Sequence, residues 1–165
     1  MPKIDIATAP RKTGSVYPEP YNSWMAGRSS VRLGQAAGLT QFGVNIVHLE
    51  PCAPASLRHW HLKEDEFAMV LTGELVLIED DGESVLKPGE CAAWKAGVPN
   101  AHRFINRSDA PASFLVVGTS QPDEVATYGD VDMMIHMQGQ NPPRFTYHDG
   151  SDWAGPRDLP RGEQK

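Results

Sequence analysis

Residues 41–119 form a succession of short segments rich in β-branched and aromatic residues, each bounded by turn-forming residues. The chain has 15 glycines and 14 prolines among 165 residues, and clusters such as Asp80-Asp81-Gly82-Glu83 lie between the segments. Short strands separated by turns at nearly regular spacing are typical of antiparallel sandwiches and barrels. The sequence therefore predicts an all-β domain. The expected strands are 42–49, 56–61, 66–71, 74–79, 84–86, 91–94, 101–106 and 113–119.

The flanking segments are less regular. Residues 1–22 mix proline, charge and tyrosine without periodicity, and residues 33–37 could form one helical turn. The predicted organisation is an N-terminal arm at 1–40, a barrel core at 41–120, and C-terminal strands and a tail at 121–165 that pack on the barrel. Two further strands are expected, at 132–137 and 144–147.

Charge and hydropathy exclude two classes of partner. The net charge of −6 argues against nucleic acid, because phosphate binding needs a clustered basic surface. No apolar run approaches the roughly 18 residues of a membrane span, and residues 1–9 lack the apolar core of a secretory signal. Cys52 and Cys91 are expected to be reduced thiols. We expect a cytoplasmic protein without nucleic-acid or membrane partners.

Four residues form a candidate metal site. His59 and His61 are two positions apart on an expected strand, so their side chains project from the same face. Glu66 opens the next strand, and His102 comes from a later segment. Neutral imidazoles and a carboxylate suit one divalent Mn, Fe, Co, Ni, Cu or Zn ion, which ligand type alone does not distinguish. Such an ion could act as a Lewis acid or could orient an oxygen ligand. The alternative is a metal-free cavity in which these side chains form hydrogen bonds.

Two sets of residues resemble the two characteristic motifs of the cupin superfamily. The first set is His59-x-His61-x4-Glu66-x6-Gly73, and the second consists of Pro88-Gly89, Gly97 and His102-x3-Asn106. The resemblance implies a double-stranded β-helix (jelly-roll) barrel with irregular N- and C-terminal arms, in which the four matching His and Glu side chains bind one metal ion. Similar small bacterial single-domain cupins include some labelled as sugar-phosphate isomerases. The resemblance also implies a homodimer, and residues 16–22 are the segment expected to cross to the partner.

Three functions are compatible with this site. The first is a metal-dependent enzyme acting on an oxygen-rich small molecule, such as a sugar or sugar-phosphate isomerase. The second is an iron-dependent dioxygenase, and the third is a small-molecule-binding cupin without enzymatic activity. No catalytic residue is assigned; Glu64 and Asp65 could serve as a general acid or base but are favoured as turn residues.

A phosphorylated substrate requires basic side chains that face the site. Strand alternation turns Arg58 and Arg103 away from the predicted metal ligands, whereas Arg32, Lys95 or Arg144 could reach the mouth of the barrel from loops. Two tryptophans, Trp60 and Trp94, are expected to pack on the outer face or between subunits. His48, His136 and His148 have no comparable ligand context.

Overall fold

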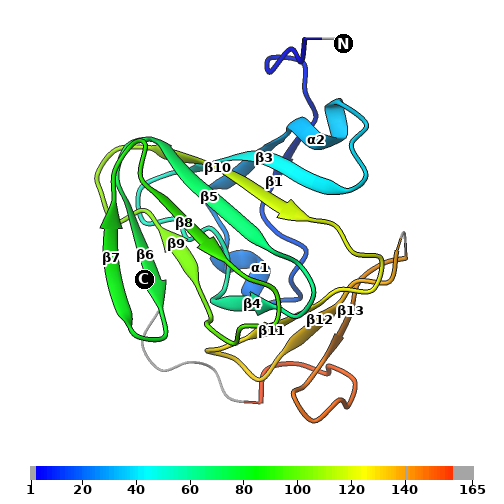
Figure 1. Cartoon of the computed structure of the whole chain (residues 1–165). Coiled ribbons are helices and arrows are strands. Elements are labelled where there is room, and N and C mark those ends of the chain that lie inside the picture. Colours follow the sequence, from blue (N-terminus) through cyan, green and yellow to red (C-terminus); the bar gives the residue numbers. More distant parts are fainter. Residues whose placement is uncertain (1–2, 140, 158–165) are drawn as a thin grey trace.

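The computed structural model describes residues 3–139 and 141–157, and their strands form three sheets (Figure 1). The six-stranded sheet has the order β1 (Arg11–Thr13), β2 (Arg28–Arg32), β3 (Phe42–Leu49), β10 (Ala112–Thr119), β5 (Glu66–Thr72) and β8 (Cys91–Trp94). The three-stranded sheet consists of β7 (Gly82–Leu86), β6 (Leu75–Glu79) and β9 (Arg103–Ile105). The four-stranded sheet consists of β13 (Arg144–Thr146), β12 (Met134–His136), β11 (Val125–Tyr128) and β4 (His59–His61). The helices are α1 (Tyr21–Trp24) and α2 (Leu33–Ala36). These strand pairs are antiparallel, and the predicted all-β class is confirmed.

The main core lies on the inner face of the large sheet. Phe114 of β10 stands opposite Val47 of β3 and Val70 of β5, and all three side chains are buried. Strand alternation sends the adjacent Leu115 and Met69 to the other face. The strands predicted from this pattern at 42–49, 66–71 and 113–119 correspond to β3, β5 and β10.

The N-terminal region contributes strands that the sequence analysis did not predict. In the stretch 27–41 only a helical turn was expected, and α2 confirms it, but β2 precedes that turn and pairs with β3. Alternation explains the strand: Val31 is fully buried on one face, whereas Arg28, Ser30 and Arg32 share the opposite face.

Residues 16–22 pack on their own chain. The ring of Tyr17 meets Tyr128 of β11 edge-on, with centroids 5.4 Å apart, and Tyr21 of α1 is buried in a second hydrophobic cluster beside the four-stranded sheet. Figure 1 shows α1 close to β4 and β11. The homodimer, and the crossing of this segment to a partner within it, stay predictions.

The C-terminal strands at 132–137 and 144–147 were predicted and correspond to β12 and β13, whereas β11 was not predicted. Within the described residues, no helix is long and apolar enough to cross a membrane.

Candidate metal centre

Backbone pairing brings the histidines of the candidate site together. His59 and His61 lie on the short strand β4, where both pair with β11. His59 and His102 form an isolated bridge, in which the His59 N–H donates to the His102 carbonyl at 3.1 Å and the His102 N–H donates back at 2.9 Å. His102 therefore immediately precedes β9, rather than lying within a strand as expected, and it stands directly opposite His59.

The Glu66 carboxylate lies among these rings. Its Oε2 atom is 3.1 Å from Nε2 of His61 and 3.9 Å from Nε2 of His102. His59, His61 and Glu66 each offer a ligand atom within 4.8 Å of the other two. His102 is not part of this close group of three, but the centroid of its ring lies 5.1 Å from that of His59. All four predicted ligands thus gather at one place.

Two of the histidines have a tautomer fixed by the backbone. Nδ1 of His59 lies 2.9 Å from the Leu57 carbonyl oxygen, and Nδ1 of His102 lies 3.2 Å from that of Asn100. A carbonyl can only accept, so each Nδ1 carries the proton and each Nε2 keeps its lone pair. The buried Nε2 of His102 has no hydrogen-bond partner among the described residues. An unpaired buried lone pair facing a carboxylate fits a cation, which would satisfy both groups.

A second carboxylate lies on the far side of His61. Its Nδ1 is buried without a hydrogen-bond partner within the described ranges and lies 3.6 Å from Oε1 of Glu124. Glu124 is 1% exposed and accepts the N–H groups of Leu62 at 2.7 Å and Lys63 at 2.9 Å. A proton moved from Nε2 to Nδ1 of His61 would face Glu124 and would free Nε2 for a metal ion.

The electrostatics of the site favour the metal-binding forms of His59 and Glu66, whereas His61 holds a proton more tightly than an ordinary histidine. Burial, followed by the neighbouring His61 and His102, lowers the pKa of His59 to about 3, so this ring is neutral. Burial raises the pKa of Glu66, but the adjacent His102 and His61 rings lower it more, and the net pKa lies below its ordinary range. Burial also lowers the pKa of His61, but Glu66 and then Glu124 raise it above its ordinary value.

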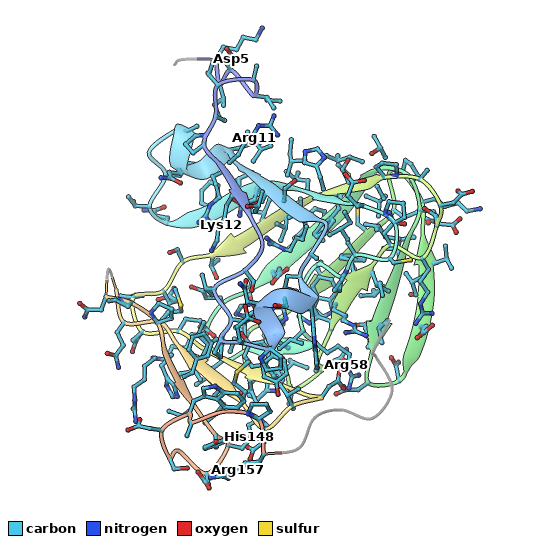
Figure 2. All side chains as sticks on the ribbon, turned by 180° about the vertical axis from the view of Figure 1, so that it is seen from behind. Asp5, Arg11, Lys12, Arg58, His148 and Arg157 are labelled. Atoms are coloured by element: carbon cyan, nitrogen blue, oxygen red, sulfur yellow. The ribbon has the colours of Figure 1, made fainter. Side chains whose placement is uncertain are left out.

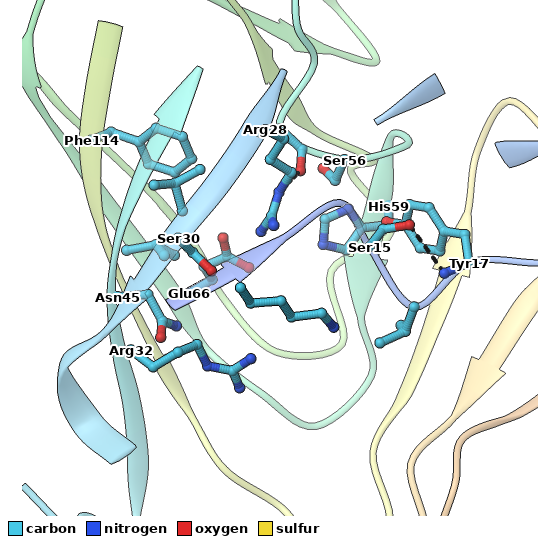
Figure 3. Close-up of a pocket in the computed structure, with 15 residues that line it drawn as sticks. Ser15, Tyr17, Arg28, Ser30, Arg32, Asn45, Ser56, His59, Glu66 and Phe114 are labelled. Atoms are coloured by element: carbon cyan, nitrogen blue, oxygen red, sulfur yellow. Dashed lines mark hydrogen bonds between the residues drawn. The ribbon is translucent and has the colours of Figure 1, made fainter. Parts of the chain in front are cut away.

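A cavity of about 290 Å³ opens in front of His59 and Glu66 (Figure 3). This volume is near the lower end of the range for ligand pockets and suits a small molecule. Basic side chains also line it: Lys12 of β1 with Arg28 and Arg32 of β2. The sequence analysis named Arg32 as able to reach the mouth but missed Lys12 and Arg28, because residues 1–40 were interpreted as an arm. Alternation in Arg28-x-Ser30-x-Arg32 was the signal that could have identified Arg28.

The other basic candidates lie elsewhere. Arg58 points away from the site as predicted, and it pairs with Asp130 at 2.7 Å and Asp80 at 3.0 Å. Lys95 does not line this cavity, but it lines a second, mostly apolar depression that Glu66 and Trp94 also border. Arg144 pairs with Asp152 at 2.6 Å. In Figure 2, Arg58 lies below Lys12, on the other side of α1.

Trp94 differs from its predicted role. It stands opposite Glu66 in the β5–β8 ladder, and its ring stacks on His102 with centroids 3.8 Å apart and planes 8° apart. It therefore packs against a candidate ligand instead of on the outer face. The same alternation that placed Glu66 inward could have placed Trp94 with it.

The flanking acids have structural partners. Asp65 accepts the Ala96 N–H at 2.8 Å, which fits the predicted turn role. Glu64 accepts the Gln121 N–H at 2.6 Å and lies 3.9 Å from Nδ1 of His61. Burial raises the pKa of Glu64. Of the remaining histidines, His136 contacts Thr146 and is not part of the site.

Comparisons with known proteins identify the family of this chain. The family model described as Cupin domain matches residues 45–118. A crystal structure of a sugar phosphate isomerase from a cupin superfamily of Silicibacter pomeroyi is 56% identical, covers 93% of this chain and 97% of that chain, and has a TM-score of 0.89. No curated protein matches the chain significantly.

More distant structures share the fold alone. A protein of Acidithiobacillus ferrooxidans, described provisionally as a sugar phosphate isomerase, is 21% identical over 78% of this chain and 81% of that chain, with a TM-score of 0.69. The polyketide cyclase RemF of Streptomyces resistomycificus is 21% identical over 73% and 80%, with a TM-score of 0.58. Because the 56% identity extends over nearly the whole length of both chains, this chain belongs to the cupin superfamily and has the predicted all-β jelly-roll fold.

Proposed function

We propose that His59, His61, Glu66 and His102 hold one divalent metal ion and that the chain is a metal-dependent isomerase of a small sugar or sugar phosphate. The observation that carries this proposal is the convergence of His59, His61 and Glu66 ligand atoms within 4.8 Å at the wall of a ligand-sized cavity. The His102 lone pair, aimed at the same carboxylate, completes the set.

The four ligand residues would bind the metal ion, and the cavity wall would orient the substrate. A metal ion bound here would supply Lewis acidity to a carbonyl or hydroxyl oxygen. Glu66 supplies the negative charge, and the three imidazoles supply neutral nitrogen donors. Tyr17, whose pKa is raised by burial, stays protonated and forms the wall beside His59. The small enclosed volume orients a short substrate against these groups.

The cavity lining favours an oxygen-rich substrate over an apolar one. Ser30, Asn45 and Ser56 line it, and their side chains have no hydrogen-bond partner among the described residues. These groups can therefore receive substrate hydroxyls. The apolar residues Ala68, Val70 and Phe104, which an apolar dioxygenase substrate would contact, are instead packed in the core. The name of the 56% identical relative, a sugar phosphate isomerase, supports the same class.

Substrate interconversion tests this proposal. The protein is loaded in turn with each candidate divalent metal and incubated with aldoses, ketoses and their phosphates, while NMR follows the isomers and an electrode follows oxygen. We expect metal-dependent interconversion that is lost in Glu66→Gln and retained in Glu90→Gln, a control in an exposed turn. Oxygen consumption with iron but without isomerisation would replace the proposal with the dioxygenase. Substrate binding without any turnover would replace it with the non-enzymatic cupin.

A further inference from the structure

We propose that Lys12, Arg28 and Arg32 form an anion subsite that binds the phosphate group of the substrate. This inference rests on the proposed function for the chemistry that follows binding, but the subsite itself is built by the N-terminal strands. It lies outside residues 45–118, where the family match falls. The specificity of this chain for a charged substrate would thus reside in the segment preceding the barrel core.

Strand register places the three cations on one wall. Arg28, Ser30 and Arg32 alternate along β2, so their side chains share the inner face of the sheet. Lys12 of β1 pairs directly with Ser30 and therefore belongs to the same face. All four residues line the cavity, and Figure 3 shows Arg28, Arg32 and Ser30 on the same side of it as Glu66.

Within the described part of the chain, the positive charge on this wall has no ion-pair partner. Among the described residues that line the cavity, Glu66 is the single carboxylate, and it already contacts His61. None of the ion pairs within the described chain includes Lys12, Arg28 or Arg32. Grouping like charges in a partly enclosed space is unfavourable unless an anion neutralises them.

Burial and the neighbouring positive charges lower the pKa values of two of these groups. Burial, followed by the charges of Arg32 and Arg28, lowers the pKa of Lys12. Burial likewise lowers the pKa of Arg28, with Arg32 acting in the same direction. A bound anion would relieve both effects, because it interacts favourably with the charged forms.

Arg28 is preorganised for such a ligand. Its Nε donates to the Ala55 carbonyl at 2.6 Å and its Nη1 to the Gly14 carbonyl at 3.0 Å. These bonds fix the plane of the guanidinium while leaving Nη2 for an oxygen of the ligand. The side chains of Lys12 and Arg32 make no hydrogen bond within the described ranges, so their charged ends can close on a tetrahedral oxyanion. The anion would then lie in the same cavity as His59 and Glu66.

Titration of inorganic phosphate by calorimetry tests the subsite directly. We expect binding to the wild-type protein that weakens about tenfold or more in Lys12→Gln and in Arg32→Gln, because each removes one charge-assisted contact. Arg11→Gln removes the same charge from an exposed neighbour of Lys12 on β1 and should leave phosphate binding unchanged. Arg28 is not substituted, because the hydrogen bonds from its side chain to the carbonyls of Gly14 and Ala55 also hold the N-terminal segment.

Two readouts separate this subsite from the metal proposal. Lys12→Gln and Arg32→Gln should retain the metal content and melting temperature of the wild type, whereas His61→Ala/His102→Ala should retain phosphate binding. Acetate should bind more weakly than phosphate, because it carries less charge. Equal phosphate affinity in wild type, Lys12→Gln and Arg32→Gln would overturn the subsite, as would the absence of phosphate binding to the wild type. Loss of phosphate binding only in the histidine double variant would show that phosphate binds at the metal site instead.

Discussion

Oε1 of Glu124 lies 3.6 Å from Nδ1 of His61, on the side of the imidazole that faces away from Glu66. The histidine ring is thus placed between two carboxylates, one at each nitrogen. Glu124 is fully buried and anchored by two backbone N–H groups, so its position does not depend on solvent. It follows that Glu124 is a positioning residue for His61.

Glu124→Gln should weaken metal binding by about 10- to 100-fold, as is typical when an outer-shell partner of a histidine ligand is replaced. The amide can still accept one backbone N–H, so the fold should persist. Competition with a chelator of known affinity measures the effect, and the melting temperature monitors folding. Asp123→Asn, at the exposed neighbouring position, is the matched control. Equal metal affinity in the two variants would rule out the positioning role.

Replacement of Trp94 tests whether stacking orients His102. Trp94→Leu removes the parallel ring contact and the hydrogen bond from its Nε1 to Glu79, so His102 gains freedom and metal affinity should fall about tenfold. Trp94→Phe keeps a ring and should lose less. The same chelator competition ranks the variants, with Trp60→Phe on β4, in a different sheet, as a control. Equal metal affinities of Trp94→Leu and Trp94→Phe would contradict a role for stacking.

Stability of the metal-free protein should fall on acidification. The pKa of His59 is about 3 in the folded chain, below its ordinary value of 6.5, so the unfolded chain binds the additional proton between these values. The stability contributed by neutral His59 is present above 6.5 and is lost as the pH falls toward 3, by at most about 1.4 kcal/mol per pH unit. His61 acts in the opposite sense, since its raised pKa adds stability that is complete below 6.5 and is lost at higher pH.

Urea unfolding at several pH values, in the presence of chelator, measures this dependence. His59→Gln should flatten the slope of unfolding free energy against pH just below 6.5, while His48→Gln, outside the site, should not. An unaltered slope in His59→Gln would show that this ring is not buried in its neutral form.

Two of the four candidate ligands, His59 and His61, could be grouped from the sequence because their signal is local. His59 and His61 are two residues apart, and a strand has a period of two, so their common face follows from spacing alone. Glu66 and His102 required the resemblance, since nothing in their own neighbourhood specifies that β5 and the segment before β9 meet at β4. The antiparallel strands of the core were predictable in the same local way.

The basic wall was not predicted, for a physical reason. Arg28-Ser29-Ser30-Val31-Arg32 contains one apolar residue, so its alternation carries little hydrophobic signal, and its strand conformation depends on pairing with β3. Lys12 is positioned by the three-residue strand β1, whose conformation depends on its pairing with β2. Local patterns do not encode such tertiary pairing.

Metal content per chain is the measurement that tests the central claim most directly. Protein purified without added metal is dialysed against each candidate divalent ion and analysed by elemental mass spectrometry, alongside His61→Ala/His102→Ala and the control His136→Ala/His148→Ala. We predict one tightly held ion per wild-type chain and per control chain, and none in the double variant of the site. An unchanged stoichiometric metal content in His61→Ala/His102→Ala would contradict the assignment.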